Sequence, residues 1–329
     1  MATLVRRKPE GTLDPGDHVF RGVLGSAGAM VLILTSAVGL FLSLRAAEAL
    51  SVAGWSFLST SDWEPDAHRF GIRAVMTGTL LIGFTAVSMA FPLALGTALY
   101  ISEYAPTRLR AWLISLIDLM AAVPSVVYGL WGFFLLQGQV AGVSRWIATY
   151  LGWIPLLQVD MRIFKPHDPL SSPSDFTSST FIAGLVVALM ITPITCSVMR
   201  ESFSQAPVGE REGAYALGAT RWGMIRAVVL PFGKGGIIGG TMLGFGRALG
   251  ETVAVFMIIS LTLAVQPNIL QKGGSSISAL IALRYGEASL FGTSALMAAG
   301  LALFLMTLAV NIAASAIVAR SRSGAVSGS

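Results

Sequence analysis

The chain contains six apolar runs that are long enough to cross a membrane as helices. Crossing about 30 Å of hydrocarbon at 1.5 Å per residue takes about 20 residues, and each run reaches that length. The runs are 22–44, 74–102, 111–136, 176–199, 235–265 and 288–319. Four of them carry no charged residue, whereas the third contains Asp118 and the fifth contains Arg247 and Glu251.

Helices are the expected form of these runs, because backbone groups in hydrocarbon must find hydrogen-bond partners within their own segment. The short alternating strands of a membrane barrel are absent. The sequence therefore predicts an all-α membrane protein with six transmembrane helices. Its predicted parts are an N-terminal segment 1–21, a first helix 22–44, an external loop 45–73, a five-helix core 74–319 with an inside loop 200–234, and a tail 320–329.

The composition agrees with a membrane protein and excludes several other classes. Of the 329 residues, 54% are hydrophobic and 12% are charged, and the mean hydropathy is +0.73. A soluble domain needs roughly a quarter of its residues charged. These values exclude a disordered chain, a disulfide scaffold and a soluble enzyme. Cys196 is the only cysteine, so no disulfide or thiolate metal site can form within the chain.

Lysine and arginine are distributed unevenly between the connecting segments. More of them lie on the side of the N-terminus, where Arg6, Arg7 and Lys8 precede the first run. Because cytoplasmic loops retain positive charge, both termini are predicted to be cytoplasmic and the first run to be an uncleaved helix. The net charge of +5 comes from the ends of apolar runs, which indicates contact with anionic lipids and not with nucleic acid.

Motifs for nucleotide hydrolysis and for hydrolytic catalysis are absent from the sequence. In the fragment nearest to a G-x-x-x-x-G-K-[ST] loop, Val228 and Gly235 replace the first glycine and the hydroxyl residue. No H-E-x-x-H or G-x-S-x-G motif occurs either. The chain is therefore predicted not to be an enzyme by itself and to hold no cofactor or metal.

The inside loop has the local signals of two short helices that meet at an angle. Glu210 and Glu212 place acidic residues in a first turn, Gly218 suits a left-handed position after a helix, and Thr220 suits the N-cap of a second helix. Apolar and basic side chains, among them Leu217, would then face the cytoplasm. Such an elbow could fill a groove in a partner or lie on the lipid head groups.

The same loop carries a spaced series of residues. In order these are Glu212, Gly213, Ala214, Gly218, Val228, Leu230 and Pro231. The series resembles the E-A-A-x3-G-x9-I-x-L-P signature of ATP-binding-cassette importer permeases, with Gly213 in place of alanine and Val228 in place of isoleucine. In that family the loop is a coupling helix that sits in a cleft of a cytoplasmic ATPase. The resemblance implies that the ATPase-docking residues are Glu212, Gly213, Ala214, Gly218, Arg221, Leu230 and Pro231.

Further fragments resemble one branch of that family. They are 63–65, 70–72, 102–105, 124–129, 216–222 and 246–252. These fragments resemble the PstC-type subunit of phosphate-specific (Pst) importers, from which Asp118 departs where glutamate is usual. The resemblance implies a type I importer permease (MetI-like) bundle in the bacterial plasma membrane, with inorganic phosphate as the substrate. The implied partners are a PstA-type second permease, a PstB-type ATPase dimer and a PstS-type external phosphate-binding protein.

Three charged residues within the apolar runs are candidates for the substrate path. A charge at mid-depth costs about 2.5 to 3.5 kcal/mol to insert, so it faces the interior of a bundle and is usually functional. Arg247 and Glu251 are four apart, so on one helix they share a face and can pair. Arg247 is the candidate anion contact, since a guanidinium fork matches phosphate oxygens. Glu251 could also accept a proton-bearing phosphate oxygen, and Asp118 is a further candidate, as a second counter-charge or as a residue near the head groups.

Other interpretations stay open at this point. Gly236, Gly240 and Gly244 recur every four residues, a spacing that serves either a contact with a partner subunit or packing within the chain. The pair Arg247 and Glu251 could be purely structural. Bilayer physics indicates only an anion, so sulfate or molybdate could replace phosphate. A self-sufficient secondary carrier and a membrane scaffold or sensor are the alternatives outside the importer class.

Overall fold

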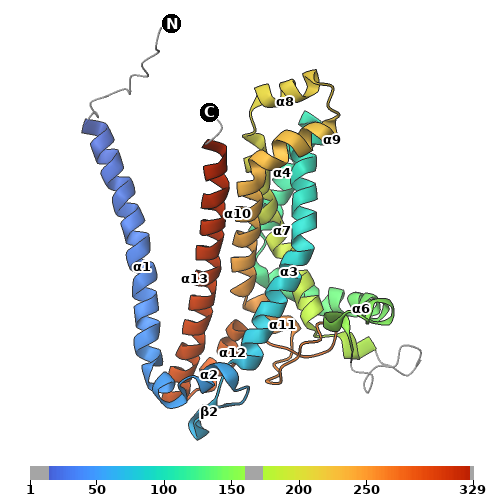
Figure 1. Cartoon of the computed structure of the whole chain (residues 1–329). Coiled ribbons are helices and arrows are strands. Elements are labelled where there is room, and N and C mark those ends of the chain that lie inside the picture. The colour runs from blue at the N-terminus through green and yellow to red at the C-terminus, as the bar shows by residue number, and fades with distance from the viewer. Residues whose placement is uncertain (1–14, 160–172, 327–329) are drawn as a thin grey trace.

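The computed structural model describes residues 15–159 and 173–326, and helices dominate it (Figure 1). In chain order the elements are α1 Pro15–Ala53, α2 Ser56–Ser59, β1 Trp63–Glu64, η1 Pro65–Ala67, β2 Arg69–Phe70, α3 Arg73–Leu99, η2 Tyr100–Tyr104, α4 Thr107–Ala122, α5 Ser125–Trp131, η3 Gly132–Leu136, α6 Gln137–Leu151, η4 Pro155–Leu157, η5 Pro173–Phe176, α7 Thr180–Ser204, α8 Val208–Ala216, α9 Arg221–Met224, η6 Ile225–Val229, α10 Leu230–Leu249, α11 Val253–Ile258, α12 Ile277–Arg284, η7 Tyr285–Glu287 and α13 Leu290–Val326.

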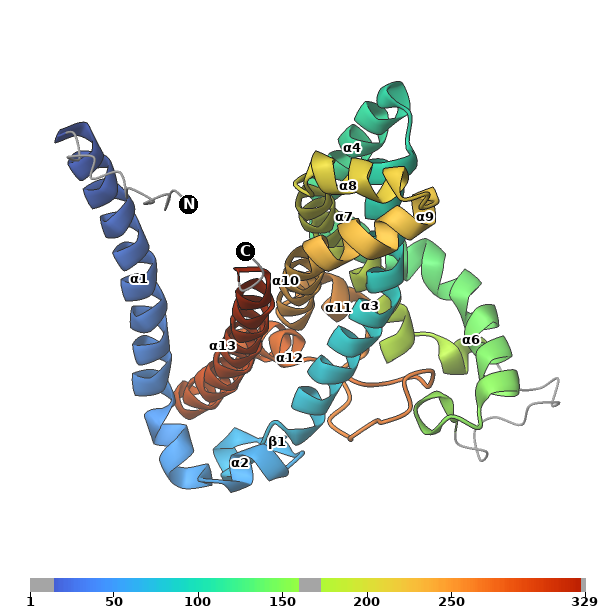
Figure 2. The same ribbon diagram turned by 45° about the horizontal axis from the view of Figure 1, so that its top comes forward.

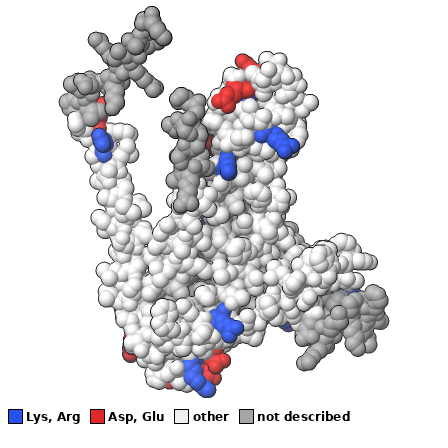
Figure 3. Space-filling model, in the orientation of Figure 1, with Lys and Arg blue, Asp and Glu red and all other residues white. Residues whose placement is uncertain are grey.

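Six helical stretches in the described residues are long and apolar enough to cross a membrane. They are Gly16–Ala53, Arg73–Tyr104, Ser125–Leu151, Thr180–Ser204, Arg221–Leu249 and Leu290–Val318. The predicted helical class and the number of candidate spans are thus confirmed. Charged side chains on the face drawn in Figure 3 gather at the two ends of the molecule and leave a nearly uncharged middle, as a hydrocarbon environment requires.

The centre of the bundle is formed by α3, α7 and α10, with α7 the most buried of the six candidate spans. By contrast, α1 packs chiefly against α13, and none of the residues in its most apolar window is buried. Figures 1 and 2 both show the first part of α1 standing away from the bundle. The start of α1 and the end of α13 lie at the same end of the bundle as α8 and α9 (Figure 1).

The glycines of α10 that recur every four residues pack against α7 within the chain. A Cβ at Gly240 would lie 3.1 Å from the carbonyl oxygen of Thr195 and 3.3 Å from Cβ of Val198. A Cβ at Gly236 would overlap the side chain of Ser202. These contacts assign the four-residue spacing to packing inside the subunit, which was one of the two interpretations of the sequence.

Gly78 allows α3 to approach the backbone near α12, and this contact gives a stability prediction. A Cβ at Gly78 would overlap the carbonyl group of Ser275, and the next residue, Thr79, accepts a hydrogen bond from the amide of Ile277 at 3.0 Å. Because the obstacle is backbone, Gly78→Ala is expected to destabilise the fold by about 2 kcal/mol, as overpacking does. Thermal unfolding in detergent measures the effect. Gly96→Ala on the same helix, with nothing within 4 Å of its Cβ, is the control that leaves stability unchanged or raises it; equal behaviour of the two variants would contradict this packing.

The third span lies later in the chain than the sequence predicted. The predicted helix 111–136 is broken, because Val123 precedes Pro124 and takes an extended conformation (φ −66°, ψ 127°). The candidate span is Ser125–Leu151, which extends into the loop expected between the predicted helices 111–136 and 176–199. Residues 160–172 of that loop lie outside the described residues.

The fifth predicted helix, 235–265, is also interrupted. Helix α10 ends at Leu249, a short α11 follows, and the chain from 259 to 276 is largely irregular. The backbone of that segment is held by the start of α7, since Phe181 donates to the carbonyl of Ile269 at 2.9 Å and Gly273 donates to that of Ser178 at 3.2 Å. Irregular backbone at membrane depth is tolerated where such partners exist.

Three further boundaries differ from the expected ones. The first helix is longer at both ends than 22–44. The external loop 45–73 contains α2 and a two-stranded hairpin in which Trp63 pairs with Phe70. The last helix continues through residues 320–326 of the predicted tail.

Candidate functional site

The connection between α7 and α10 forms an elbow of two short helices, as the sequence predicted. Gly218 has φ +83°, a left-handed conformation that glycine adopts without strain. The amide of Ala219 donates to the carbonyl of Ala214 at 3.0 Å. This is the hydrogen bond of a Schellman cap that joins the residues farther apart in sequence. Helix α9 then begins after Thr220, whose Oγ1 accepts from the amide of Gly223 at 3.1 Å. Local capping therefore fixes the angle between α8 and α9.

The elbow carries large apolar side chains at the end of the bundle. Leu217 is 91% exposed and Val208 is 67% exposed, while Trp222 and Tyr215 are about half exposed. Figures 1 and 2 show α8 and α9 lying across the ends of the long helices. A cluster of exposed apolar groups of this kind indicates a surface that another protein or a membrane covers.

The seven predicted docking residues divide into exposed and packed positions. Those with exposed side chains or backbone are Glu212, Gly213, Gly218, Arg221 and Pro231. Ala214 and Leu230 are partly buried against the cluster that contains Met199 and Phe203. Ala214 and Leu230 therefore seat the elbow on the bundle, and only the five exposed residues can contact a partner directly.

A buried ion pair below the elbow was not found by sequence reasoning. Nη1 of Arg211, on α8, lies 3.0 Å from both carboxylate oxygens of Glu103, and Nη2 donates to the carbonyl of Phe203 at 2.6 Å. Arg221 on α9 lies over the ring of Tyr104 with its guanidinium carbon 4.9 Å from the ring centre. Both arginines thus tie the elbow to η2, at the end of α3.

The predicted pairing of Arg247 with Glu251 is wrong. The two residues do not share a helix, because α10 ends at Leu249, and no ion pair joins them in the part of the chain that the structure describes. Glu251 is buried, and its Oε1 accepts from the amide of Ala254 at 3.2 Å, which caps the start of α11. Its carbonyl accepts from the hydroxyl of Ser278 at 2.8 Å. Arg247 remains on α10 with its side chain exposed.

Asp118 lies outside the candidate spans. It is exposed on α4, which precedes the break at Pro124. Over residues 15–159 and 173–326, no ion pair links it to Arg247. The structure therefore does not bring the three intramembrane candidates of the sequence together.

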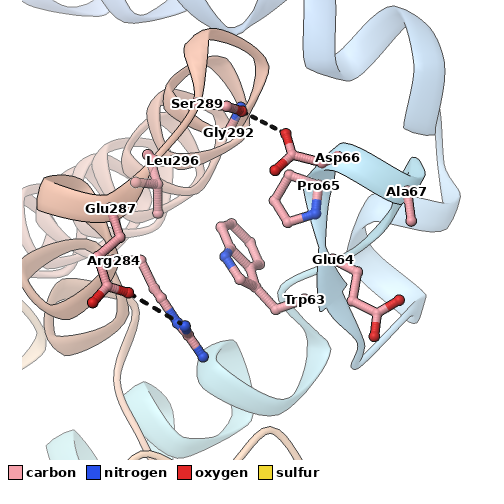
Figure 4. Close-up of a pocket in the computed structure, with 11 residues that line it drawn as sticks. Trp63, Glu64, Pro65, Asp66, Ala67, Arg284, Glu287, Ser289, Gly292 and Leu296 are labelled. Atoms are coloured by element: carbon pink, nitrogen blue, oxygen red, sulfur yellow. Dashed lines mark hydrogen bonds and ion pairs between the residues drawn. The ribbon is translucent and has the colours of Figure 1, made fainter.

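A cavity of about 390 Å³ lies at the opposite end of the bundle from the elbow, between the hairpin and the start of α13 (Figures 1 and 4). Figure 4 shows Trp63 facing it, with Asp66 accepting a hydrogen bond from Ser289 and Arg284 lying 3.8 Å from Glu287. Three carboxylates and one guanidinium line this cavity. Its charge therefore disfavours an anion.

Comparison with known proteins gives the following similarities. A family described as "Binding-protein-dependent transport system inner membrane component" matches residues 90–323. The chain is 37% identical over 308 residues to "Phosphate transport system permease protein PstC 2" of Mycobacterium tuberculosis, covering 92% of this chain and 91% of that one. It is 35% identical over 322 residues to a PstC of Xylella fastidiosa, covering 95% and 96%.

Solved structures resemble the chain in fold. A chain of a bacterial alginate ABC transporter aligns with TM-score 0.56 at 16% identity, covering 92% of this chain and 96% of that chain. A chain of the MetNI methionine transporter aligns with TM-score 0.52 at 13% identity, covering 76% and 95%. At these identities the likeness concerns the arrangement of helices alone.

Proposed function

The chain belongs to the binding-protein-dependent transport system inner membrane component family and, within it, to the PstC phosphate transport permeases, and from this membership we propose that it forms the phosphate path of an ATP-driven importer. Its fold is the MetI-like bundle of type I importer permeases. The chain is a multi-pass inner-membrane protein, and ATP hydrolysis is performed by a separate subunit. The observation that carries the proposal is the sustained identity over nine-tenths of both chains.

The elbow is the docking element for the cytoplasmic ATPase, which works as a dimer. Supporting this role are the exposure of Leu217 and Val208 and the position of the elbow at the same end as the start of α1 and the end of α13. That end is then cytoplasmic. A second permease chain lines the other side of the path, and an external phosphate-binding protein docks at the opposite end, where the hairpin lies.

Arg247 is the anion contact in the path. An exposed guanidinium on an apolar span does not face lipid, because the insertion cost is too high. In the assembled transporter it therefore faces water or the second permease, where its fork matches phosphate oxygens. Glu251 shapes the path beyond the end of α10 by capping α11. Asp118, exposed on α4, has no part in this proposal.

Glu251 also offers a test of anion selectivity. One carboxylate oxygen caps α11, and the other can accept a proton-bearing phosphate oxygen, which sulfate lacks. Glu251→Gln keeps an acceptor for the amide of Ala254 but loses the charge. We expect sulfate to compete about tenfold better against phosphate uptake in this variant. The reason is that the carboxylate that favours a proton-bearing anion is then lost from the path. Glu48→Gln, at an exposed position on α1, is the control; unchanged competition in Glu251→Gln would remove Glu251 from substrate selection.

Uptake of labelled phosphate tests the proposed function as a whole. Cells that lack this chain are compared with cells in which it is restored, at low phosphate and with sulfate or molybdate as competitor. The importer interpretation predicts uptake that returns with the chain, requires the ATPase and resists both competitors. Uptake blocked by sulfate or molybdate would assign a different oxyanion, uptake without any ATPase would indicate a secondary carrier, and no effect on uptake would favour a scaffold.

A further inference from the structure

The Glu103 and Arg211 pair differs from the other ion pairs in the described residues. Its side chains are 4% and 20% exposed, whereas each of the other two pairs has both members at least two-fifths exposed. The two residues are 108 positions apart in sequence. A buried ion pair adds little net stability compared with apolar packing, whereas removing one partner is costly, so this pair holds its two helices in a fixed relation.

Arg211 joins three helices through one guanidinium. It projects from α8, its Nη1 meets both oxygens of Glu103 in η2, and its Nη2 donates to the carbonyl of Phe203 in the last turn of α7. Ser102 donates to Oε1 of Glu103 at 2.8 Å and so holds the carboxylate in place. A cation at the end of a helix is also favoured by the helix dipole of α7.

The local backbone supports this geometry. Residues Tyr100–Tyr104 form a π-turn that Ala105 closes by donating to the carbonyl of Tyr100 at 2.8 Å. Such turns often occur at functional positions, because the additional residue changes the direction of the side chains. Helices α3 and α7, which the pair connects to α8, have the most extensive mutual packing in the chain.

We propose that Glu103 and Arg211 act as a positioning clamp, through which α8 and the joined ends of α3 and α7 move as one body when the ATPase displaces the elbow. This inference rests on the proposed function. Without the clamp, α8 would be tied to the bundle only by its capped connections and by the apolar packing of Ala214, and less of the force would reach α3 and α7. The stacking of Arg221 on Tyr104 is a second, weaker link between the same parts.

A double-mutant cycle on the reconstituted transporter tests the clamp. The four proteins are the unaltered chain, Glu103→Gln, Arg211→Gln and the double variant, each assembled with its partners in proteoliposomes. The readout is phosphate moved per ATP hydrolysed, which a purely structural role would not change in complexes that assemble. Each single variant is expected to lower this ratio about tenfold, within the usual range of coupling between sites. The double variant is expected to be no worse than the poorer single, because both deletions break the same contact.

Three results would overturn the clamp. The first is a value of phosphate moved per ATP within about twofold of the unaltered chain in either single variant, and the second is a loss in the double variant that equals the product of the two single losses. The third is a loss in Arg108→Gln as large as in the single variants. Arg108 is the matched control, an exposed arginine at the start of α4. If a single variant does not copurify with the ATPase, Arg211→Lys is measured in its place. The clamp then predicts that the phosphate moved per ATP hydrolysed lies between the values of the unaltered and the double-variant proteins. A value equal to that of the unaltered chain contradicts the clamp. If the unaltered complex moves no phosphate, the proposed function fails, and the clamp is then judged by the same non-additivity in ATP hydrolysis.

Discussion

Replacing Arg247 with glutamine is expected to lower phosphate uptake about 100-fold, because two charge-assisted hydrogen bonds to the anion, together worth about 3 kcal/mol, are lost. The side chain is exposed on an apolar helix, and no ion pair of the described residues uses it, so the substitution breaks none of them. The complex should therefore assemble normally. Initial rates of labelled phosphate uptake at low phosphate measure the effect, and Arg247→Lys should lie in between, because a point charge replaces the fork.

The matched control for this prediction is Arg21→Gln. Arg21 is an exposed arginine on α1, which packs chiefly against α13 and not against the central helices. Its replacement should leave uptake unchanged. Should Arg247→Gln transport phosphate as well as Arg21→Gln, Arg247 is not on the path, and its exposed guanidinium serves contact with the second permease instead.

Replacing Leu217 with aspartate is expected to weaken association with the ATPase about 100-fold, which corresponds to about 3 kcal/mol. Leu217 is 91% exposed at the apex of the elbow, where an apolar group that a partner buries is an interface anchor. A carboxylate there would be buried without a counter-ion. The fraction of ATPase that copurifies with the permease measures the loss, and uptake should fall with it.

Leu290→Asp is the control for the elbow. Leu290 is 95% exposed at the first residue of α13, at the opposite end of the bundle. It offers the same change of side chain at the same exposure, and the ATPase should copurify as before. Unchanged copurification with Leu217→Asp would favour the interpretation in which the elbow lies on the lipid head groups.

The features that sequence reasoning predicted well are those set by a few neighbouring residues. Apolar length alone gives six spans, since a hydrocarbon layer has a fixed thickness. The elbow follows from Gly218 and Thr220, because a left-handed turn favours glycine and an N-cap favours a hydroxyl. In both cases the physical cause and the residues that carry it are adjacent in the chain.

Features that depend on interruptions within apolar runs were predicted less well. Hydropathy continues across Pro124 and across Gly250, so the runs alone give no sign that the helices end there. Gly250 carried little information as a stop, since Gly236, Gly240 and Gly244 lie inside the same helix and serve its packing on α7. The expected pairing of Arg247 with Glu251 failed for this reason.

The clamp could not be predicted because its members are distant in sequence. Glu103 looked like an ordinary charge at the end of an apolar run and Arg211 like a basic residue of the inside loop. Only folding brings η2 and α8 together. The local signal that exists is weak: Glu103 stands in a fragment, 102–105, that matched the permease resemblance without an evident role. Long-range contacts between polar residues leave no periodicity to detect.

Phosphate accumulation in sealed proteoliposomes tests the central claim most directly. Vesicles contain this chain with the second permease and the ATPase, with the phosphate-binding protein on one face and ATP on the other, and matched vesicles lack only this chain. The account predicts ATP-dependent accumulation of phosphate in the complete vesicles and none in the matched set. Accumulation that persists without this chain, or its absence from the complete, assembled vesicles, would contradict the claim that this chain forms the phosphate path.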